Sequence, residues 1–393
     1  MHNSGSLFSD LICFSHLRWD FVFQRPQHLL TRFAKQYRVF YIEETIFSHE
    51  PDSFSLRKTP ENVWVVNLNI RHHGTESEMR VRQQNLLSQL FEIAAIKDYI
   101  FWFYTPMPVF ISEHLHPKMI IYDCMDELKA FKSAPTALTE REPLLFQKAD
   151  LVFTGGFSLY HAKKGLHHNI HPFPSSIDKV HFGEARSMEG EPADLVSIAH
   201  PRFGFFGVID ERFDIPLLRD VATARPDWQF VIVGPVAKIS HHDLPHLPNI
   251  HYLGNKSYSE LPQYLAGWDI AMVPFARNES TKFISPTKTP EYLAAGCPVI
   301  STSITDVVDP YGKMNLVQIA DSPEEFIAAA EKELANENYA EWLCKVDDFL
   351  AENSWDKTWR SMMTLIIETL KLKEVKIKNN VEIIINKKEK IYV

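Results

Sequence analysis

Short apolar segments alternate with amphipathic segments along most of this chain of 393 residues. The apolar segments indicate buried strands and lie at 11–15, 39–42, 63–66, 100–103, 120–122, 151–154, 202–207, 229–233, 250–253, 269–273 and 298–301. Predicted helices stand between many of them, at 26–35, 77–95, 139–148, 217–223, 258–266 and after Lys288. Strands linked through helices make right-handed crossovers in a mainly parallel sheet. The pattern therefore predicts an α/β protein built from two halves of similar size.

The chain length and one polar segment set the predicted domain boundaries. At about 150 residues per domain, a chain of this length forms two or three domains. Residues 173–194 are polar, contain Pro and Gly and carry charges of both signs, which is typical of a linker. We therefore predict a first domain over residues 1–178, a second domain over 195–354 and a closing helix over 355–370.

The last stretch, residues 371–393, has a different composition from the rest. It holds seven lysines against three glutamates, with isoleucine and asparagine among them. Two interpretations stay open. One is a loosely ordered basic tail. The other is a contact with an anionic membrane surface, to which each basic residue adds about 1 kcal/mol.

The net charge and the cysteines exclude several classes of protein. A formal net charge of −9 argues against a nucleic-acid-binding protein, because phosphate backbones demand a concentrated positive surface. The four cysteines are widely spaced, which suits reduced thiols better than disulfides or a zinc site. The start of the chain shows no signal peptide, and no apolar run is long enough to span a bilayer. We expect a cytoplasmic protein without a metal site, and a peripheral contact at the inner face of the membrane stays open.

Residues 285–302 combine a loop, a short helix and a buried strand. A helix N-terminus carries free N–H groups and about half a positive charge, so it attracts phosphate. Lys288 adds a full charge there, and Glu291 lies one turn deeper on roughly the same face. The lysine suits the phosphates of a nucleotide diphosphate, and the carboxylate suits its ribose hydroxyls. Because Pro290 lacks an N–H group, we expect the helix to begin there, with Thr289 as its cap. A capped surface helix with a solvated lysine is the alternative interpretation of this stretch.

Two aspartates are the main candidates for acid–base chemistry in the first half. Asp123 and Asp126 follow the predicted strand at 120–122, at the sheet edge where open α/β sheets bind ligands. A carboxylate there can act as a general base when burial or a neighbouring charge raises its pKa. Helix capping by Asp126 and hydrogen bonds from loop amides to Asp123 are the alternative.

The loop after the first strand, residues 16–25, holds a rival set of candidates. His16, Arg18 and Asp20 are polar residues at the same kind of sheet edge. Trp19 lies between them and can stack on a sugar, although aromatic residues in loops are at least as often packing residues.

Motifs from both halves together resemble GT-B glycosyltransferases, and the match is nearest to bacterial polysaccharide and teichuronic-acid-type enzymes related to glycosyltransferase family 4. The motifs lie at 19–20, 24–29, 122–127, 174–178 and 286–298. The resemblance implies a GT-B fold of two Rossmann-like domains that face a cleft. It also implies that the second domain holds the nucleotide-sugar and the first the acceptor, and that the last helix crosses back to the first domain.

The resemblance implies donor-binding roles for residues of the second half. Lys288 would hold the diphosphate and Glu291 the ribose. Gly207 would form the turn beneath the pyrophosphate, and Arg212 would be a second cation, with a solvated arginine as the alternative. Further donor contacts would come from Ser285, Thr287, Asn255 and Lys256, the last two near the base.

In the first half, the resemblance and the sheet-edge argument together nominate Asp126, Asp123 and His16 for catalysis. Arg18, Trp19 and Asp20 are the predicted acceptor contacts. One departure from the family is visible at Phe283, where relatives often carry a glutamate eight positions before the one that Glu291 matches.

We therefore expect a metal-independent glycosyltransferase of the hexosyltransferase type, without a cofactor, in bacterial polysaccharide biosynthesis. It would move a sugar from a UDP-sugar or another nucleotide-sugar to a glycan or lipid-linked acceptor. Two alternatives stay open. One is a nucleotide-sugar epimerase of the same fold, and the other is a nucleotide-sugar-binding protein without catalysis, which Phe283 motivates.

Overall fold

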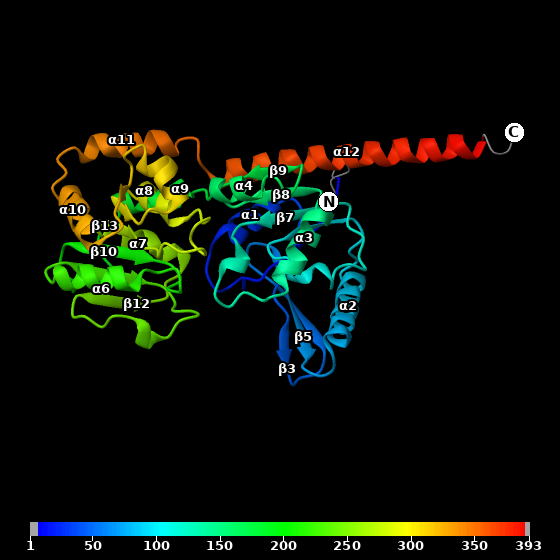
Figure 1. The fold of residues 1–393 in the computed structure, drawn as a ribbon, viewed down its shortest axis with the longest axis horizontal. Helices are drawn as coiled ribbons and strands as arrows, with labels where there is room; N and C mark the ends of the chain where they lie inside the picture. Colours follow the sequence, from blue (N-terminus) through cyan, green and yellow to red (C-terminus); the bar gives the residue numbers. More distant parts are fainter. Residues whose placement is uncertain (1–6, 390–393) are drawn as a thin grey trace.

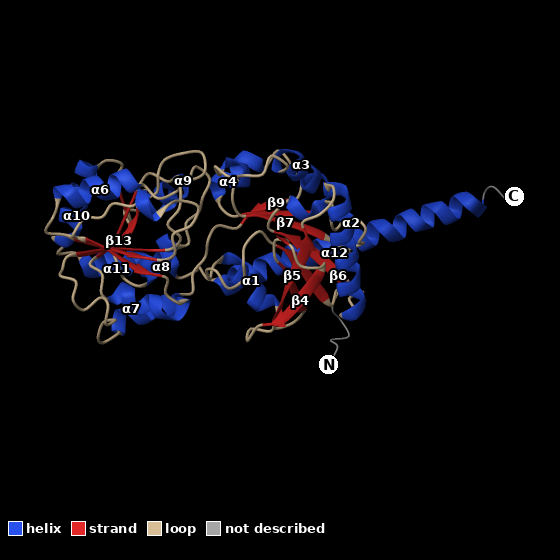
Figure 2. Ribbon diagram, turned by 90° about the horizontal axis from the view of Figure 1, so that it is seen from below, coloured by secondary structure: helices blue, strands red, loops and turns tan. Residues whose placement is uncertain are grey.

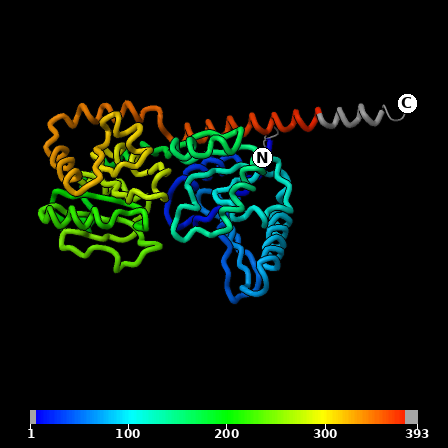
Figure 3. Tube along the Cα trace, in the orientation of Figure 1, coloured from blue at the N-terminus to red at the C-terminus, as the bar shows by residue number. Residues whose placement is uncertain are grey.

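The computed structural model describes residues 7–389, with side chains up to residue 379. The chain forms two α/β domains that lie side by side, each with its own sheet (Figure 1). The Cα trace crosses between them after β9 (Ile170–Pro172) and again before α12 (Trp355–Glu389) (Figure 3). The prediction of two α/β halves with mainly parallel sheets is confirmed.

The sheet of the first domain has nine strands within the described residues, in the order β3-β5-β2-β1-β6-β7-β8-β9, with β4 paired to β5. Only the β4–β5 pair is antiparallel among these strands. Besides β9, the strands are β1 (Asp10–Phe14), β2 (Arg38–Ile42), β3 (Ile46–Ser48), β4 (Ser53–Lys58), β5 (Val63–Arg71), β6 (Tyr99–Phe103), β7 (Ile120–Cys124) and β8 (Leu151–Thr154). Parallel pairing brings the carboxyl ends of β1, β6, β7 and β8 to one edge of the sheet.

Helices cover both faces of the first sheet (Figure 2). On one face, α1 (Arg25–Phe33) and α12 share a buried cluster that includes Leu29 and Ile366. The other face is covered by α2 (Glu76–Ile93), α3 (Leu138–Lys148) and α4 (Phe157–Lys163). Local sequence fixes the helix starts, because Pro26 stands in the first turn of α1 and Thr75 caps α2 through a capping box.

The sheet of the second domain is parallel, in the order β12-β11-β10-β13-β14-β15. Its strands are β10 (Arg202–Phe206), β11 (Gln229–Val233), β12 (Ile250–Gly254), β13 (Ile270–Val273), β14 (Val299–Ser301) and β15 (Gln318–Ile319). Its helices are α6 (Ile215–Ala224), α7 (Leu261–Ala266), α8 (Lys288–Ala294), α9 (Thr305–Val307), α10 (Pro323–Leu334) and α11 (Tyr339–Leu350). One continuous apolar core holds these elements together.

The segment predicted as a linker is more structured than expected. It contains α5 (Lys179–Gly183) and a 3₁₀ turn, and α5 packs against α7 and α8 of the second domain. Ile177 and Phe182 are buried in the core of that domain, which explains the difference, because two apolar anchors outweigh the polar composition around them. The chain therefore enters the second domain's core before residue 195.

The final helix, α12, returns to the first domain. Trp355 and Leu370 are buried against it, and Arg32 Nε of α1 lies 2.7 Å from Asp356 Oδ1. The helix continues past residue 370 to Glu389, through much of the stretch for which a loose tail was one interpretation. Residues 390–393 of that stretch lie outside the described residues.

Candidate functional site

A cleft lies between the two domains, at the carboxyl ends of strands from both sheets. Loops after β1, β7 and β8 line it from the first domain, and loops after β10, β11, β12 and β13 line it from the second. The space measures about 1120 Å³, including its opening to solvent. Because open α/β sheets bind ligands at this edge, the cleft is the candidate active site.

Gly207 ends β10 in a turn that favours glycine. Its φ is +137°, in the region that residues with a Cβ rarely adopt. A Cβ at this position would lie 2.3 Å from Cε of Lys288 and 2.6 Å from its Nζ. The Lys288 side chain therefore packs directly on the backbone of this turn. Its Nζ also lies 5.4 Å from the ring centre of Phe205 and 5.6 Å from that of Phe275, within the range of cation–π attraction.

The helix α8 begins at Lys288, with Thr287 as its N-cap, and not at Pro290. This corrects the expected start. Pro290 is the third residue of the helix, and the first four N–H groups of a helix have no partner within it, so the missing N–H costs no helix hydrogen bond. One consequence is that Lys288 and Glu291 lie three residues apart on the same short helix, as predicted.

Lys288 and Glu291 both line the cleft. Neither side chain has a hydrogen-bond or ion-pair partner among the described residues. Burial lowers the pKa of Lys288, and the charge of Arg212 lowers it further. Burial raises the pKa of Glu291, and the charge of Lys288 opposes that rise. A half-buried cation and a buried carboxylate without hydrogen-bond partners gain most from a ligand that offers hydrogen bonds to both.

Arg212 is the second cation of the cleft. Its Nη2 lies 2.7 Å from Oδ2 of Asp210 and its Nε 2.9 Å from Oδ1, which fixes the plane of the guanidinium. Its Nη1 has no hydrogen-bond partner among the described residues. The guanidinium is therefore oriented by Asp210 and keeps donors for a ligand.

The far end of the cleft holds the residues predicted near the base. Asn255 is exposed, and Lys256 is held by Asp194, with Nζ 2.6 Å from Oδ2. Tyr258 lies beside them and was not predicted. Its ring stacks between Phe23 at 4.4 Å and His181 at 4.2 Å, and its buried hydroxyl has no partner among the described residues.

The two aspartates after β7 have different environments. Asp123 is fully buried and forms a two-pronged ion pair with Arg25, at 2.8 and 3.0 Å. Asp126 lines the cleft, and burial raises its pKa, which the charge of Arg212 counteracts. No described residue gives the Asp126 carboxylate a hydrogen bond. Asp126 can therefore accept a proton from a ligand, whereas Asp123 is occupied by Arg25 and does not line the cleft.

The other predicted residues of the first loop do not line the cleft. Arg18 Nη1 lies 3.0 Å from Oε2 of Glu43, and the Trp19 backbone N–H donates to Oε1 of the same carboxylate at 2.7 Å. Asp20 pairs with Arg57 at the surface. None of the three lines the cleft, because Glu43 and Arg57 hold them, and their contact with an acceptor stays a prediction. His16 also lies outside the cleft, in two adjoining cavities, and burial lowers its pKa to about 4.

Comparisons with known proteins fit this arrangement. Residues 200–336 match the family model described as "Glycosyl transferases group 1". TuaH of Bacillus subtilis (strain 168), whose name describes a glycosyltransferase of teichuronic acid biosynthesis, is 29% identical over 262 residues. That match covers 61% of this chain and 65% of TuaH, slightly less than two thirds of its length.

Solved structures match almost the whole chain. Sucrose-phosphate synthase from Thermosynechococcus elongatus is 13% identical, with 92% of this chain and 98% of that chain covered and a TM-score of 0.69. Anabaena HepE in complex with UDP and glucose is 12% identical, with 91% and 99% covered and a TM-score of 0.63. The chain has the GT-B fold. The resemblance to GT-B glycosyltransferases inferred from the motifs is thereby confirmed.

The GT-B cleft brings together all eight predicted donor residues, although they come from the loops after β10, β12 and β13 and from α8. Those that line it are Gly207, Arg212, Asn255, Lys256, Ser285, Thr287, Lys288 and Glu291, with Asp126 from the opposite domain. Ser285 also joins the domains, since Ser175 Oγ donates to its backbone oxygen at 2.5 Å. Phe283 does not line the cleft and packs against the apolar cluster of the first domain.

The described residues contain no group of three or more His, Cys, Asp or Glu side chains that could hold a metal ion. Within the same residues, no helix combines the length and apolar character needed to cross a membrane.

Proposed function

We propose that this protein is a glycosyltransferase that moves a sugar from a UDP-sugar to a glycan or lipid-linked acceptor. The single observation that carries the proposal is the pair of half-buried Lys288 and buried Glu291 in the cleft, neither of which has a hydrogen-bond or ion-pair partner among the described residues. The names of two structural relatives, which include UDP and UDP-2-fluoro glucose, support a uridine nucleotide as the donor.

In this proposal, the donor lies along the second domain. Lys288 and the free Nη1 of Arg212 bind the diphosphate, and Glu291 accepts hydrogen bonds from ribose hydroxyls. Burial raises the pKa of Tyr258 and the nearby Glu291 carboxylate raises it further, so the Tyr258 hydroxyl stays protonated and is a further hydrogen-bond donor for the ribose. The base then lies toward Asn255, at the exposed end of the cleft.

The reaction needs two contributions from the protein, which are stabilisation of the leaving diphosphate and a base for the acceptor proton. An acceptor hydroxyl oxygen bonds to the anomeric carbon, the bond from that carbon to the diphosphate oxygen breaks, and the hydroxyl proton is lost. Lys288 and Arg212 stabilise the negative charge that grows on the leaving diphosphate. Asp126, on the opposite wall, takes the proton, because its carboxylate has no hydrogen-bond partner among the described residues and burial raises its pKa.

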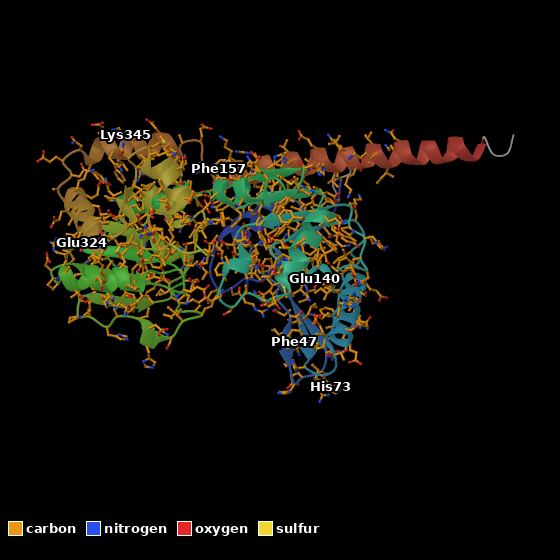
Figure 4. The ribbon with its side chains drawn as sticks, in the orientation of Figure 1. Phe47, His73, Glu140, Phe157, Glu324 and Lys345 are labelled. Atoms are coloured by element: carbon orange, nitrogen blue, oxygen red, sulfur yellow. The ribbon has the colours of Figure 1, made fainter. Side chains whose placement is uncertain are left out.

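Calorimetric titration with UDP and GDP tests the donor site. We expect UDP to bind, and Lys288→Ala and Glu291→Ala each to weaken binding by about 1.5–3 kcal/mol, roughly ten- to a hundredfold. Lys345→Ala, on the outer surface of α11, is the control and should bind UDP like the wild type (Figure 4). Failure of UDP to bind, or a UDP affinity that neither Lys288→Ala nor Glu291→Ala changes, would remove the basis of the proposal.

A second candidate function is a nucleotide-sugar-binding protein without catalysis, which Phe283 favours because it replaces a carboxylate of the family pattern with a packing residue. Incubation of the protein with UDP-sugars and acceptors separates the two. Release of UDP that disappears in Asp126→Asn supports the transferase. Tight UDP binding without release from any donor supports the binding protein.

We also propose a peripheral contact with an anionic membrane through the start of the α12 extension. Leu372, Val375 and Ile377 are 63%, 54% and 60% exposed, and lysines alternate with them. Co-sedimentation with phosphatidylglycerol vesicles tests this contact. We expect binding that falls with salt and with Lys376→Glu/Lys378→Glu, and salt-independent or absent binding would count against it.

A further inference from the structure

A second large cavity, here called the side pocket, lies in the first domain. It is bounded by the loop after β2 with strand β3, by the first turns of α2 and by the start of α3, and it measures about 1660 Å³ including its opening. Phe47 on β3 and Glu140 on α3 lie on this side of the domain (Figure 4). No residue of the donor cleft lines the side pocket.

A third cavity connects the side pocket to the donor cleft. It shares His16, Glu44, Thr105 and Met107 with the side pocket. At its other end it shares Asp126 and Arg212 with the donor cleft. An elongated ligand in this connecting cavity would therefore have one end at the proposed base and the rest in the side pocket.

The walls of the side pocket combine apolar surface with free hydrogen-bonding groups of both kinds. Phe47 is 49% exposed, and the guanidinium groups of Arg80 and Arg141 lie 5.8 and 5.3 Å from the ring centre of Phe110. Glu44, Glu140 and Arg80 line the pocket and have no hydrogen-bond or ion-pair partner among the described residues. Nε of Arg141 and Nδ1 of His16 are buried and likewise unpartnered.

These groups suit a ligand rich in hydroxyls. A carboxylate only accepts and a guanidinium only donates, whereas a hydroxyl does both, so hydroxyls can satisfy all of these free groups. The aromatic rings offer apolar faces to the C–H surfaces that a sugar ring also has. Of the four glutamates in the lining, Glu43 is paired with Arg18 and Glu76 with Arg141. This leaves Glu44 and Glu140 against the single cation of Arg80. A phosphate would therefore meet an excess of negative charge.

We propose that the side pocket binds neutral sugar units of an elongated glycan acceptor and does not bind the phosphate of a carrier. The accepting hydroxyl reaches Asp126 through the connecting cavity, past His16. This assignment rests on the proposed transferase function and selects, from the acceptors named there, the part of the molecule that the first domain recognises.

Ligand-observed NMR on the UDP-loaded protein tests the assignment. The probes are maltose, cellobiose, lactose and N,N′-diacetylchitobiose, with geranyl diphosphate as the phosphate-bearing comparison. We expect at least one disaccharide to bind. Phe47→Ala should weaken it by roughly two- to tenfold, the loss expected for one aromatic contact. Glu44→Gln/Glu140→Gln should weaken it by roughly tenfold or more, since two charge-assisted hydrogen bonds become neutral ones.

Phe157→Ala is the matched control. Phe157 on α4 is 50% exposed, like Phe47, but lines neither the side pocket nor the connecting cavity (Figure 4). This variant should bind the disaccharide like the wild type. All variants should keep the wild-type UDP affinity and melting temperature, which shows that they fold and that the two sites are separate.

Three results would each overturn the assignment. No disaccharide binds the wild type, or disaccharide affinity is unchanged by Phe47→Ala and by the glutamate changes. The third is that geranyl diphosphate binds and that Phe47→Ala weakens its binding. Failure of the transferase proposal gives a different result. UDP would then fail to bind, while disaccharide binding would still depend on Phe47.

Discussion

The contact between Gly207 and Lys288 makes a prediction that couples the two residues. A Cβ at position 207 would lie 2.3 Å from Cε of Lys288, so Gly207→Ala forces the lysine away from the turn. The φ of +137° adds backbone strain of about 1–3 kcal/mol to the variant's folding free energy. We expect Gly207→Ala to lose most of the UDP affinity that Lys288→Ala loses, about 1.5–3 kcal/mol.

The double variant Gly207→Ala/Lys288→Ala measures how much of this loss of UDP affinity depends on the lysine side chain. Lys288→Ala removes Cε and Nζ, so the clash disappears and only the backbone strain remains. Adding Gly207→Ala to it should therefore cost little further UDP affinity, which gives a coupling of about 1–3 kcal/mol in a double-mutant cycle. Calorimetry measures the UDP affinities, and urea unfolding measures the strain in both backgrounds. Losses of UDP affinity that add to within about 0.5 kcal/mol would refute the reasoning, because they would mean that the glycine acts independently of Lys288.

Three further predictions concern the carboxylates of Glu291, Asp126 and Asp123. Glu291→Gln should stabilise the ligand-free protein at neutral pH, on the order of 1 kcal/mol, while weakening UDP binding. Burial raises the folded-state pKa of Glu291 above its unfolded value, so the contribution of Glu291 to stability is full below the unfolded pKa and is lost as the pH rises through the folded pKa. Urea unfolding at mildly acidic and mildly alkaline pH should show this decline in the wild type and not in the variant. Equal pH dependence of the two proteins would contradict the prediction. Asp126→Asn should abolish sugar transfer and keep the UDP affinity. The wild-type rate should fall with falling pH at a midpoint above the pKa of an ordinary aspartate, because burial raises the pKa of Asp126. A wild-type kcat in the variant would exclude Asp126 as the base. Asp123→Asn should destabilise the fold by about 3–5 kcal/mol, since it leaves Arg25 buried without its carboxylate. The double variant Arg25→Met/Asp123→Leu should recover part of that loss. An unchanged melting temperature of Asp123→Asn would show that the ion pair does not stabilise the fold.

The sequence predicted the fold through features that are local. Apolar segments such as 100–103 form strands because their length and composition leave no other way to bury them, and their alternation with helices determines a parallel sheet. Lys288 and Glu291 were also predictable, since three residues on one helix turn bring two side chains to one face. The extent of α12 was not predictable, because residues 371–379 alternate apolar and basic residues without a helical stripe.

The site residues that were missed depend on contacts between distant parts of the chain. Asp123 and Asp126 look alike in the sequence, and Arg25, which occupies the first of them, lies 98 residues away. Arg18 and Trp19 look like ligand contacts in the sequence, but both donate hydrogen bonds to Glu43, which follows the next strand. Tyr258 enters the cleft because Phe23 of the other domain stacks on it. The only sequence signal for Tyr258 was its position three residues after Asn255.

A crystal structure of the protein with UDP tests the central claim most directly. We predict a diphosphate within hydrogen-bonding distance of Lys288 Nζ and Arg212 Nη1, and ribose hydroxyls on the carboxylate of Glu291. Asp126 should then stand across the cleft from the β-phosphate, with the opening of the connecting cavity beside it. UDP bound elsewhere, or a cleft that stays empty while calorimetry shows saturation, would contradict the assignment of the donor site.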